Sequence, residues 1–301
     1  MTTKDHSLAT VYSARMERRQ LEYFLAVVEH GGFTNAARAM YVAQPSLSHA
    51  IAALEAELGG ALFHRLPHGA VPTAAGEALI VPARQVTRDL STAAATVREV
   101  LGLSGGRLDI VAQTTFAVDP LSGLLGEFLR SHPRVAVRVT DPEQATQVGH
   151  LVRSGDCELG LVDATVPCGD LESLLLGDLT LHLVLPPGHA WHREVGLADL
   201  ATLRFVATPQ GTATRGVLDE ALRQIGLAPE IAVETTHRAM IVPLVLEGAG
   251  AALLPKSMAA DAGVKGAVVV TTEPPLRYSA RLVWRSGPLS PAAAGFVALA
   301  R

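Results

Sequence analysis

Cysteine, charge and long apolar stretches are all scarce in this 301-residue sequence. Its two cysteines, Cys157 and Cys168, match neither a disulfide framework nor a zinc site in their spacing. No apolar run is long enough to span a bilayer, and the first 15 residues lack the apolar core of a signal peptide. We therefore expect a cytoplasmic protein. Residues 1–16 are expected to be a disordered extension, with Met16 as an alternative start.

An excess of positive charge is also missing. The formal net charge is −4, which argues weakly against a protein that only binds nucleic acid. Any affinity for DNA must come from a few well-placed charges or from two copies of the chain. The sequence also contains no G-x-S-x-G elbow, no P-loop and no metal-ligand cluster, so we expect neither an enzyme nor a bound cofactor or metal.

The chain divides into three parts by composition. Residues 17–72 show short helical patterns with tight turns, residues 73–104 are rich in alanine, and residues 107–301 alternate strand and helix patterns. A chain of 301 residues, 49% of them hydrophobic, is long enough for two or three cores. The third part predicts an α/β domain with a largely parallel sheet.

Residues 44–58 predict a helix with a buried stripe and an unusual outer face. The stripe consists of Leu47, Ile51, Leu54 and Leu58. Small or hydrogen-bonding residues occupy the other face, namely Pro45, Ser48, His49, Ala52 and Ala56. A solvated helix usually carries charges there, so this face is suited to close contact with another surface. A short helix and a tight turn precede it, which indicates a helix-turn-helix, although the pattern alone fits a three-helix bundle equally well.

Residues 62–76 predict a hairpin wing, because two prolines and a glycine interrupt any helix. Such a wing reaches the phosphate backbone, and Arg65 is its best phosphate ligand. A salt bridge from Arg65 to Glu55 or Glu57 is the alternative.

Residues 74–104 predict a long helix with an apolar seam formed by Leu79, Val86, Leu90, Val97 and Leu101. Their spacing is typical of helix pairing. A second subunit would bury this seam, and packing against the helix's own domain is the alternative.

The chain resembles the LysR-type transcriptional regulators. The matching residues are Ala36, Ala37, Gln44, Pro45, Leu47, Ser48, Ile51, Leu54, Glu55, Leu58, Gly59, Leu62, Phe63 and Arg65. Weaker matches follow in "GRLDIVA", "SGDCELGLVDA" and "PLVLEGAGAALLP", so the resemblance covers residues 17–301.

This resemblance implies an α + α/β fold. An N-terminal winged helix-turn-helix DNA-binding domain is expected at 17–73 and a linker and dimerisation helix at 74–104. A C-terminal periplasmic-binding-protein-like α/β effector domain should follow, with subdomain I at 107–176 plus 273–301 and subdomain II at 177–272. Such proteins bind double-stranded promoter DNA as homodimers or homotetramers. A small-molecule effector changes their contact with DNA or RNA polymerase.

The match assigns DNA binding to Thr34, Gln44, Pro45, Ser46, Ser48, His49, Ala52 and Arg65. We expect Gln44 to read adenine or to hold a phosphate. Pro45 and Ala52 would contact thymine methyl groups, and Thr34 and Arg65 would contact phosphates.

Two residues depart from the family pattern. Ala43 replaces a frequent Ser or Thr cap, whose loss costs about 1 kcal/mol. Alanine here resembles the branch that controls aromatic-compound catabolism. His49 replaces a frequent arginine and offers guanine one well-directed donor instead of two, so we expect a softer base preference and some pH sensitivity.

Effector contacts are expected after the first and fifth strands, since ligands bind outside the carboxyl ends of strands in such domains. The expected residues there are Gln113, Thr114, Thr115, Thr208, Thr212, Thr214 and Arg215, and His237, which follows "VETT" in the next strand, is expected to line the same cleft. Hydroxyls, free backbone N–H groups and an arginine at a helix start indicate an organic anion, such as an aromatic carboxylate. Plain N-capping by Thr212 or Thr214 and a structural role for His237 are the alternatives. A thiol-based redox sensor using Cys157 and Cys168 is the alternative function.

Overall fold

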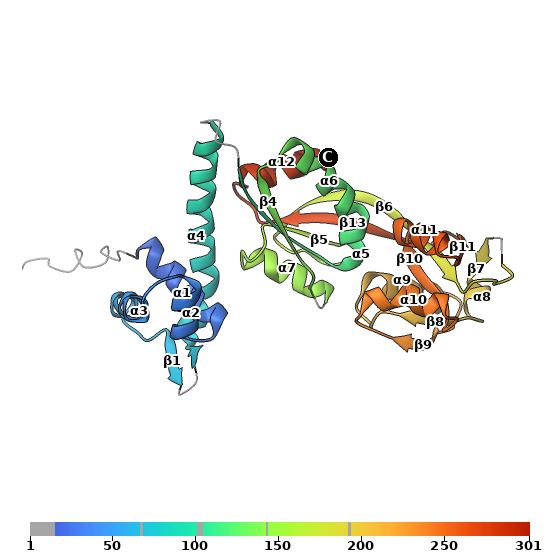
Figure 1. Cartoon of the computed structure of the whole chain (residues 1–301), viewed down its shortest axis with the longest axis horizontal. Coiled ribbons are helices and arrows are strands. Elements are labelled where there is room, and N and C mark those ends of the chain that lie inside the picture. The colour runs from blue at the N-terminus through green and yellow to red at the C-terminus, as the bar shows by residue number, and fades with distance from the viewer. Residues whose placement is uncertain (1–15, 67–68, 101–104, 143, 192–193) are drawn as a thin grey trace, which may run out of the picture. The chain divides into compact units, whose positions relative to one another are not determined.

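A computed structural model describes residues 16–66, 69–100, 105–142, 144–191 and 194–301. The chain separates into two compact units, Met1–Ala94 and Ala95–Arg301 (Figure 1). Of the expected N-terminal extension only Met16 is among the described residues, and Leu101 of the predicted seam lies outside them. No helix of the described part is long and apolar enough to cross a bilayer.

The first unit contains a winged helix-turn-helix. Its elements are α1 (Arg18–His30), α2 (Phe33–Ala39), α3 (Gln44–Leu58), the hairpin β1 (Phe63–Leu66) and β2 (Gly69–Pro72), and the beginning of α4 (Ala74–Val100). Leu47, Ile51 and Leu54 of α3 are fully buried against α1 and α2, as the helical spacing predicts. Leu58 remains 42% exposed, so the buried stripe ends one turn earlier than expected. The helix stops there because Gly59 adopts φ = 76°, a left-handed conformation that glycine takes without strain.

The starts of α2 and α4 differ in how they are capped. α2 begins at Phe33 with Gly32 as its cap, so Thr34 lies inside the first turn and does not cap the helix. Thr73 does cap α4, because its Oγ1 accepts a hydrogen bond from the Gly76 amide at 3.1 Å.

The second unit is organised around a seven-stranded sheet. Its strand order is β10–β6–β13–β5–β3–β4, and β11 also pairs with β6. The bounds are β3 (Gly106–Ala112), β4 (Val135–Thr140), β5 (Leu159–Asp163), β6 (Glu172–Leu185), β10 (Ala252–Pro255), β11 (Val268–Val270) and β13 (Arg277–Trp284). Within this sheet only β3 makes parallel pairs, with β4 and β5, so the expected largely parallel sheet is wrong. The last strand, β13, returns antiparallel between β5 and β6 and makes the sheet mixed.

Alternating side chains of the strands serve two cores in the first half of this unit. Leu159 and Leu161 of β5 pack with α6 (Ser122–Ser131) and α12 (Pro291–Leu299), whereas Val162 packs with α7 (Ala145–Arg153). The helices accordingly lie on opposite faces of the sheet (Figure 1). Gly160 allows α7 to approach closely, because a Cβ there would lie 2.7 Å from Val148 Cγ1.

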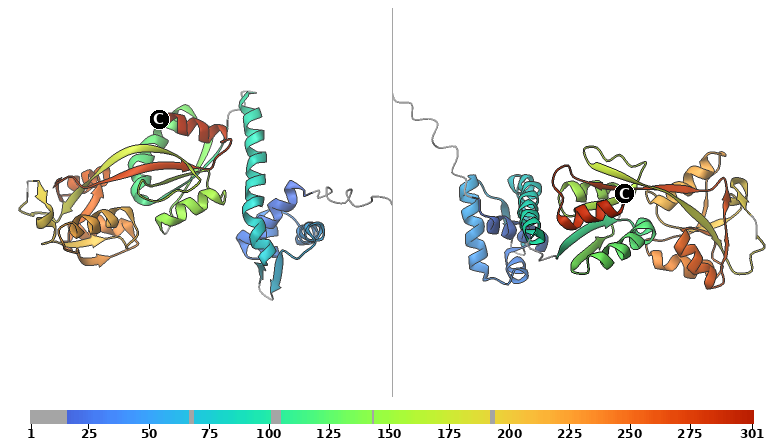
Figure 2. Two further views of the ribbon diagram at one scale, coloured as in Figure 1. Left: turned by 180° about the vertical axis from the view of Figure 1, so that it is seen from behind. Right: turned by 90° about the horizontal axis from the view of Figure 1, so that it is seen from above.

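The second half of the unit surrounds β6, β10 and β11, and the long strands β6 and β13 connect the two halves (Figure 2). Its parallel pair is β8 (Arg204–Ala207) with β9 (Glu230–Glu234). The helices are α8 (Leu197–Leu200), α9 (Ala213–Arg223), α10 (Ile241–Leu246) and α11 (Lys256–Val264), with the short 3₁₀ turn η2 (Arg238–Met240). The short strands β7 (Val195–Gly196) and β12 (Thr272–Glu273) pair in parallel, and α5 (Thr114–Phe116) and η1 (Ala117–Leu121) link β3 to α6.

Candidate DNA-binding face and ligand cleft

The outer face of α3 is exposed and uncharged over its first three turns. The exposed residues there are Gln44, Pro45, Ser46, His49, Ala52 and Ala53, and Ser48 is half-buried. Pro45 fits the first turn, where the amide it lacks would have no helical partner. Ala43 is the N-cap residue and provides no side-chain cap, as its side chain dictates. This leaves a smooth helix surface that can approach the floor of a groove.

Gln44 is the residue on this face with the longest polar reach. Its Nε2 donates to Ser48 Oγ at 2.8 Å, one turn along the helix. The bond orients the amide of Gln44 in the free protein and leaves its oxygen available as an acceptor. Gln44 and Ser48 therefore act as one polar unit at the start of α3.

Arg65 on the wing does not make the salt bridge considered from sequence. Its guanidinium carbon lies 4.6 Å from the centre of the Phe33 ring, in a cation–π contact. Glu55 has a different role, since its Oε1 accepts the Leu62 amide at 2.8 Å and fixes the start of the wing. The N–H groups of the Arg65 guanidinium stay available for a phosphate. Thr34, exposed on α2, follows Phe33 directly.

The apolar seam on α4 divides into a buried and an exposed part. Leu79 packs against the core of the first unit. Val86 and Leu90 are each 44% exposed and Val97 is 60% exposed in the single chain. Three apolar side chains at helical spacing thus remain partly exposed in the single chain.

The expected ligand residues separate into two neighbouring cavities. Thr114, Thr115, Thr208, Thr214 and Arg215 line a small cavity of about 30 Å³. Gln113 and Thr212 line a larger cavity of about 610 Å³. At the β3–α5 junction Gln113 lines the larger cavity and Thr114 the small one, and at the start of α9 Ala213 lines the larger cavity and Thr214 the small one. His237 is exposed, lines neither cavity, and donates its amide to Thr235 Oγ1 at 3.0 Å.

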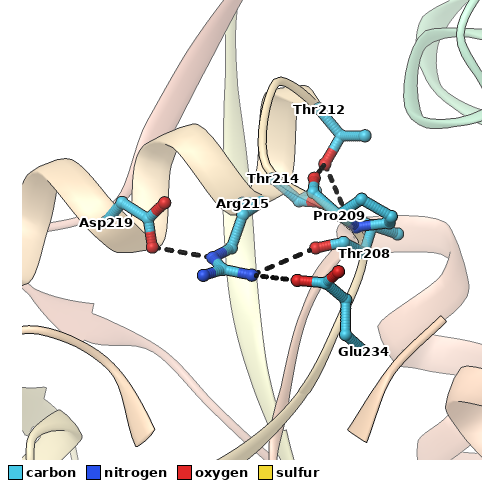
Figure 3. A network of polar contacts seen from close by, with 7 residues as sticks. All are labelled: Thr208, Pro209, Thr212, Thr214, Arg215, Asp219 and Glu234. Atoms are coloured by element: carbon cyan, nitrogen blue, oxygen red, sulfur yellow. Dashed lines mark hydrogen bonds and ion pairs between the residues drawn. The ribbon is translucent and has the colours of Figure 1, made fainter. Parts of the chain in front are cut away.

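Arg215 is buried and already neutralised. Its Nε lies 2.7 Å from Asp219 Oδ1, and its Nη1 lies 3.1 Å from Glu234 Oε2 (Figure 3). Burial acts to lower the pKa of Arg215, but hydrogen bonds and charge from Asp219 and Glu234 together raise it. The side chain therefore remains charged, and its charge is balanced by protein carboxylates.

The threonines beside it form a hydroxyl cluster. Thr208 Oγ1 contacts the hydroxyls of Thr212 and Thr214. Thr212 is the N-cap residue of α9, but its hydroxyl donates to the Pro209 carbonyl at 2.9 Å and accepts no amide of the helix (Figure 3). Plain N-capping therefore does not explain Thr212, and the first amides of α9 remain without a side-chain cap.

Gln113 faces the larger cavity with an unused donor. The residue is 2% exposed, and its Nε2 has no hydrogen-bond partner among the described residues. A buried amide without an acceptor is costly. Apolar walls from Val217, Pro275 and Leu276 complete the space.

Sequence reasoning missed Arg238, which lines the small cavity together with the threonines. It belongs to the three-residue turn η2, and no local pattern marks such a position. Only the fold brings it beside the β3–α5 junction.

The two cysteines are buried and free. Burial raises the pKa of Cys157, an effect that Asp109 and Asp156 reinforce and that Arg138 and Thr140 oppose. Cys168 directs its Sγ to the Val166 carbonyl at 3.3 Å. The reactive thiolate form is thus disfavoured at Cys157. No group of three or more metal-ligating side chains occurs among the residues that the structure describes.

Comparison with known proteins matches both units. The model of "Bacterial regulatory helix-turn-helix protein, lysR family" covers residues 18–77, and that of "LysR substrate binding domain" covers residues 101–301. The uncharacterised HTH-type transcriptional regulator YnfL of Escherichia coli K12 is 31% identical over 80% of this chain and 83% of its own.

Two solved structures share the fold. The full-length regulator CbnR, crystallised with its target DNA, aligns with a TM-score of 0.69 at 24% identity, over 95% of this chain and 99% of CbnR. Full-length OxyR C199D of Pseudomonas aeruginosa aligns with a TM-score of 0.74 at 21% identity, over 95% of this chain and 93% of OxyR.

Proposed function

This chain belongs to the LysR family of DNA-binding transcriptional regulators, and we propose that it reads promoter DNA through α3 and the wing under the control of a small organic anion in its C-terminal cleft. The family assignment gives the chain a helix-turn-helix domain and an effector-binding domain. The residues that contact DNA, the oligomer and the class of effector are our proposals. We do not propose the redox function, because both cysteines are buried and the pKa of Cys157 is raised.

The uncharged outer face of α3 is the observation that supports the DNA contacts. Gln44 would donate to and accept from adenine, or hold a phosphate, with Ser48 as its neighbour. Pro45 and Ala52 would meet thymine methyl groups, and Ser46 and His49 would complete the face. Arg65, supported by Phe33, and Thr34 would contact phosphates on either side. The solved CbnR complex, in which a regulator of this fold holds its target DNA, supports the same use of this unit.

Footprinting on the DNA upstream of the reading frame tests this proposal. Wild type should protect a site, and Gln44→Ala should lose that protection while remaining folded. Gln85→Ala is the matched control, because Gln85 is an exposed glutamine on a different helix, α4. Equal protection by the Gln44 and Gln85 variants would contradict the role of α3.

The exposed seam of α4 supports a homodimer, which could pair further into a homotetramer. Val86, Leu90 and Val97 would be covered by the same helix of a second copy. A dimer also doubles the phosphate contacts of a chain with net charge −4.

The larger cavity supports a bound metabolite. Its volume of about 610 Å³ falls within the range of small-molecule sites in proteins. The free Nε2 of Gln113 would gain an acceptor oxygen from the ligand, and the walls formed by Val217, Pro275 and Leu276 suit an apolar or aromatic body. Uncapped amides at the start of α9 and the threonine hydroxyls favour oxygen-rich, anionic groups.

Calorimetry over a panel of aliphatic and aromatic carboxylates tests the effector proposal. Gln113→Leu should weaken binding of the best acid about tenfold, which corresponds to a lost hydrogen bond of about 1.4 kcal/mol. Gln210→Leu, an exposed glutamine outside both cavities, should leave affinity unchanged. Arg215→Ala tests the arginine named from sequence. If Gln113→Leu binds the best acid as tightly as wild type does, the proposed site is contradicted.

A further inference from the structure

Arg238 and Asp141 form an ion pair between parts of the chain that are far apart in sequence. Arg238 Nη1 lies 2.9 Å from Asp141 Oδ2 and donates to Thr114 Oγ1, also at 2.9 Å. Thr114 in turn donates its hydroxyl hydrogen to Asp141 Oδ2 at 2.6 Å. Asp141 follows β4 and Thr114 follows β3, whereas Arg238 follows β9 in the second half of the unit. The carboxylate of Asp141 is therefore held by one guanidinium and one hydroxyl.

The two arginines of the small cavity differ in exposure and in the number of carboxylates that pair with them. Arg215 is 8% exposed and has two carboxylate partners. Arg238 is 20% exposed and has one, Asp141, which is itself 47% exposed. Both contacts of Arg238 use Nη1, so its Nε and Nη2 have no partner among the described residues. Five N–H donors in a planar fork can hold a second acceptor group.

The larger cavity has no surplus of positive charge that could pair with the carboxylate of a ligand. Its charged lining residues are Asp163, Glu220 and Arg277, two acids and one base. The larger cavity offers room, apolar walls and the Gln113 amide, but no surplus of positive charge. The adjacent small cavity is lined by Arg238 and four threonines and has a volume of about 30 Å³, enough for about two water molecules.

We propose that Arg238 and Thr114 form the carboxylate-binding subsite of the cleft, and that the Asp141 side chain occupies this subsite when no ligand is bound. The inference rests on the proposed effector function and names the residues that receive the anion. An incoming carboxylate replaces Asp141, which turns outward to solvent from its half-exposed position. The ligand then makes the contact to η2 that Asp141 makes in its absence.

Benzoate and benzamide are matched probes for this subsite, because they share a ring and nearly the same shape but differ in charge. Asp141→Asn removes the competing carboxylate and should bind benzoate about fivefold more tightly than wild type, as expected for loss of a partly exposed ion pair. Benzamide affinity should not change. Arg238→Gln should lose the preference for benzoate over benzamide, and Arg238→Lys should retain part of it.

The two single variants distinguish a role of the ion pair in ligand binding from a merely structural role. Asp141→Asn and Arg238→Gln both break the same ion pair, so a merely structural role would change benzoate binding in the same direction in both. The subsite predicts opposite directions. The double variant should behave as Arg238→Gln does.

The proposal is overturned if Asp141→Asn leaves benzoate affinity unchanged, if no variant binds benzoate, or if the double variant binds benzoate as tightly as Asp141→Asn. Measuring Gln113→Leu as well separates the proposed effector cavity from the proposed carboxylate subsite. Binding that needs Gln113 but not Arg238 retains the effector cavity and rejects the subsite. Binding that needs Arg238 but not Gln113 retains the subsite and rejects the larger cavity as part of the site.

Discussion

Glu158 accepts two hydrogen bonds from Ser290, one from the amide to Oε1 at 2.7 Å and one from the hydroxyl to Oε2 at 2.8 Å. Both residues are buried. Ser290 is the N-cap of α12, and its Oγ also accepts the Ala293 amide. The carboxylate thus joins the start of β5 to the N-terminus of a helix, where negative charge is favourable.

Replacing Glu158 by alanine should destabilise the second unit by about 2–3 kcal/mol, because two buried donors of Ser290 lose their charged acceptor. Glu158→Gln should cost less, since its oxygen can still accept one of them. Fluorescence-detected urea unfolding is suited to the measurement, because both tryptophans, Trp191 and Trp284, lie in this unit. Glu127→Ala, at an exposed site on α6, is the control, and equal midpoints for the two alanine variants would contradict the prediction.

Periodic and local features could be predicted from the sequence, whereas contacts between distant segments could not. The spacing of Leu47, Ile51 and Leu54 is enough to place them in a core, and Thr73 is recognisable as a cap from its neighbours. Strand pairing is different, because nothing in the sequence near β13 shows that it returns between β5 and β6. The expectation of a parallel sheet failed for this reason.

In the candidate site, too, local features could be predicted from the sequence and contacts between distant segments could not. Gln113 follows a recognisable strand, so sequence could nominate it, but its unused amide appears only in the folded structure. Arg215 could be named from sequence as an arginine at a helix start, but its pairing with Asp219 and Glu234 depends on the fold. Arg238 was missed because its partners lie 97 and 124 positions away in the chain.

Arg65→Gln should weaken binding to every DNA sequence by a similar factor and reduce the salt dependence of binding by about one phosphate contact. Arg65→Lys should restore most of the salt slope, while Phe33→Leu should weaken binding less than Arg65→Gln because it removes only the ring that holds the guanidinium. Gel-shift titrations at several salt concentrations measure both quantities. An unchanged slope for Arg65→Gln would show that the wing does not contact phosphate.

His49→Arg should sharpen base preference, because a guanidinium can hold guanine with two hydrogen bonds where an imidazole offers one. Selection of bound sequences from a randomised operator should then yield a stronger guanine preference at one position of each half-site. His30→Arg, at the exposed end of α1, serves as the control for an added charge. The same selected sequences for wild type and His49→Arg would argue that His49 does not face a base.

Cys157 should react slowly with thiol reagents and with peroxide at neutral pH. Its pKa is raised, so the thiol form persists to a higher pH than in an exposed cysteine, and labelling should accelerate only as the pH rises toward that value. Stopped-flow labelling of folded and urea-unfolded protein measures the difference. Peroxide should leave operator binding unchanged in wild type, Cys157→Ser and Cys168→Ser. A peroxide response in wild type that either serine variant abolishes would establish the redox alternative instead.

Leu90→Glu should separate the oligomer into single chains. Leu90 is 44% exposed and lies one helical turn from Val86, so a carboxylate there would have to be buried without a partner wherever two α4 helices pair. The same change should weaken operator binding far more than twofold, since each chain would keep only half of the phosphate contacts. Analytical ultracentrifugation measures the mass, and Gln85→Glu, on another face of α4, controls for the added charge. If the Leu90 variant keeps the mass of wild type, the exposed seam of α4 is not the oligomer interface, and oligomer formation must use a different surface.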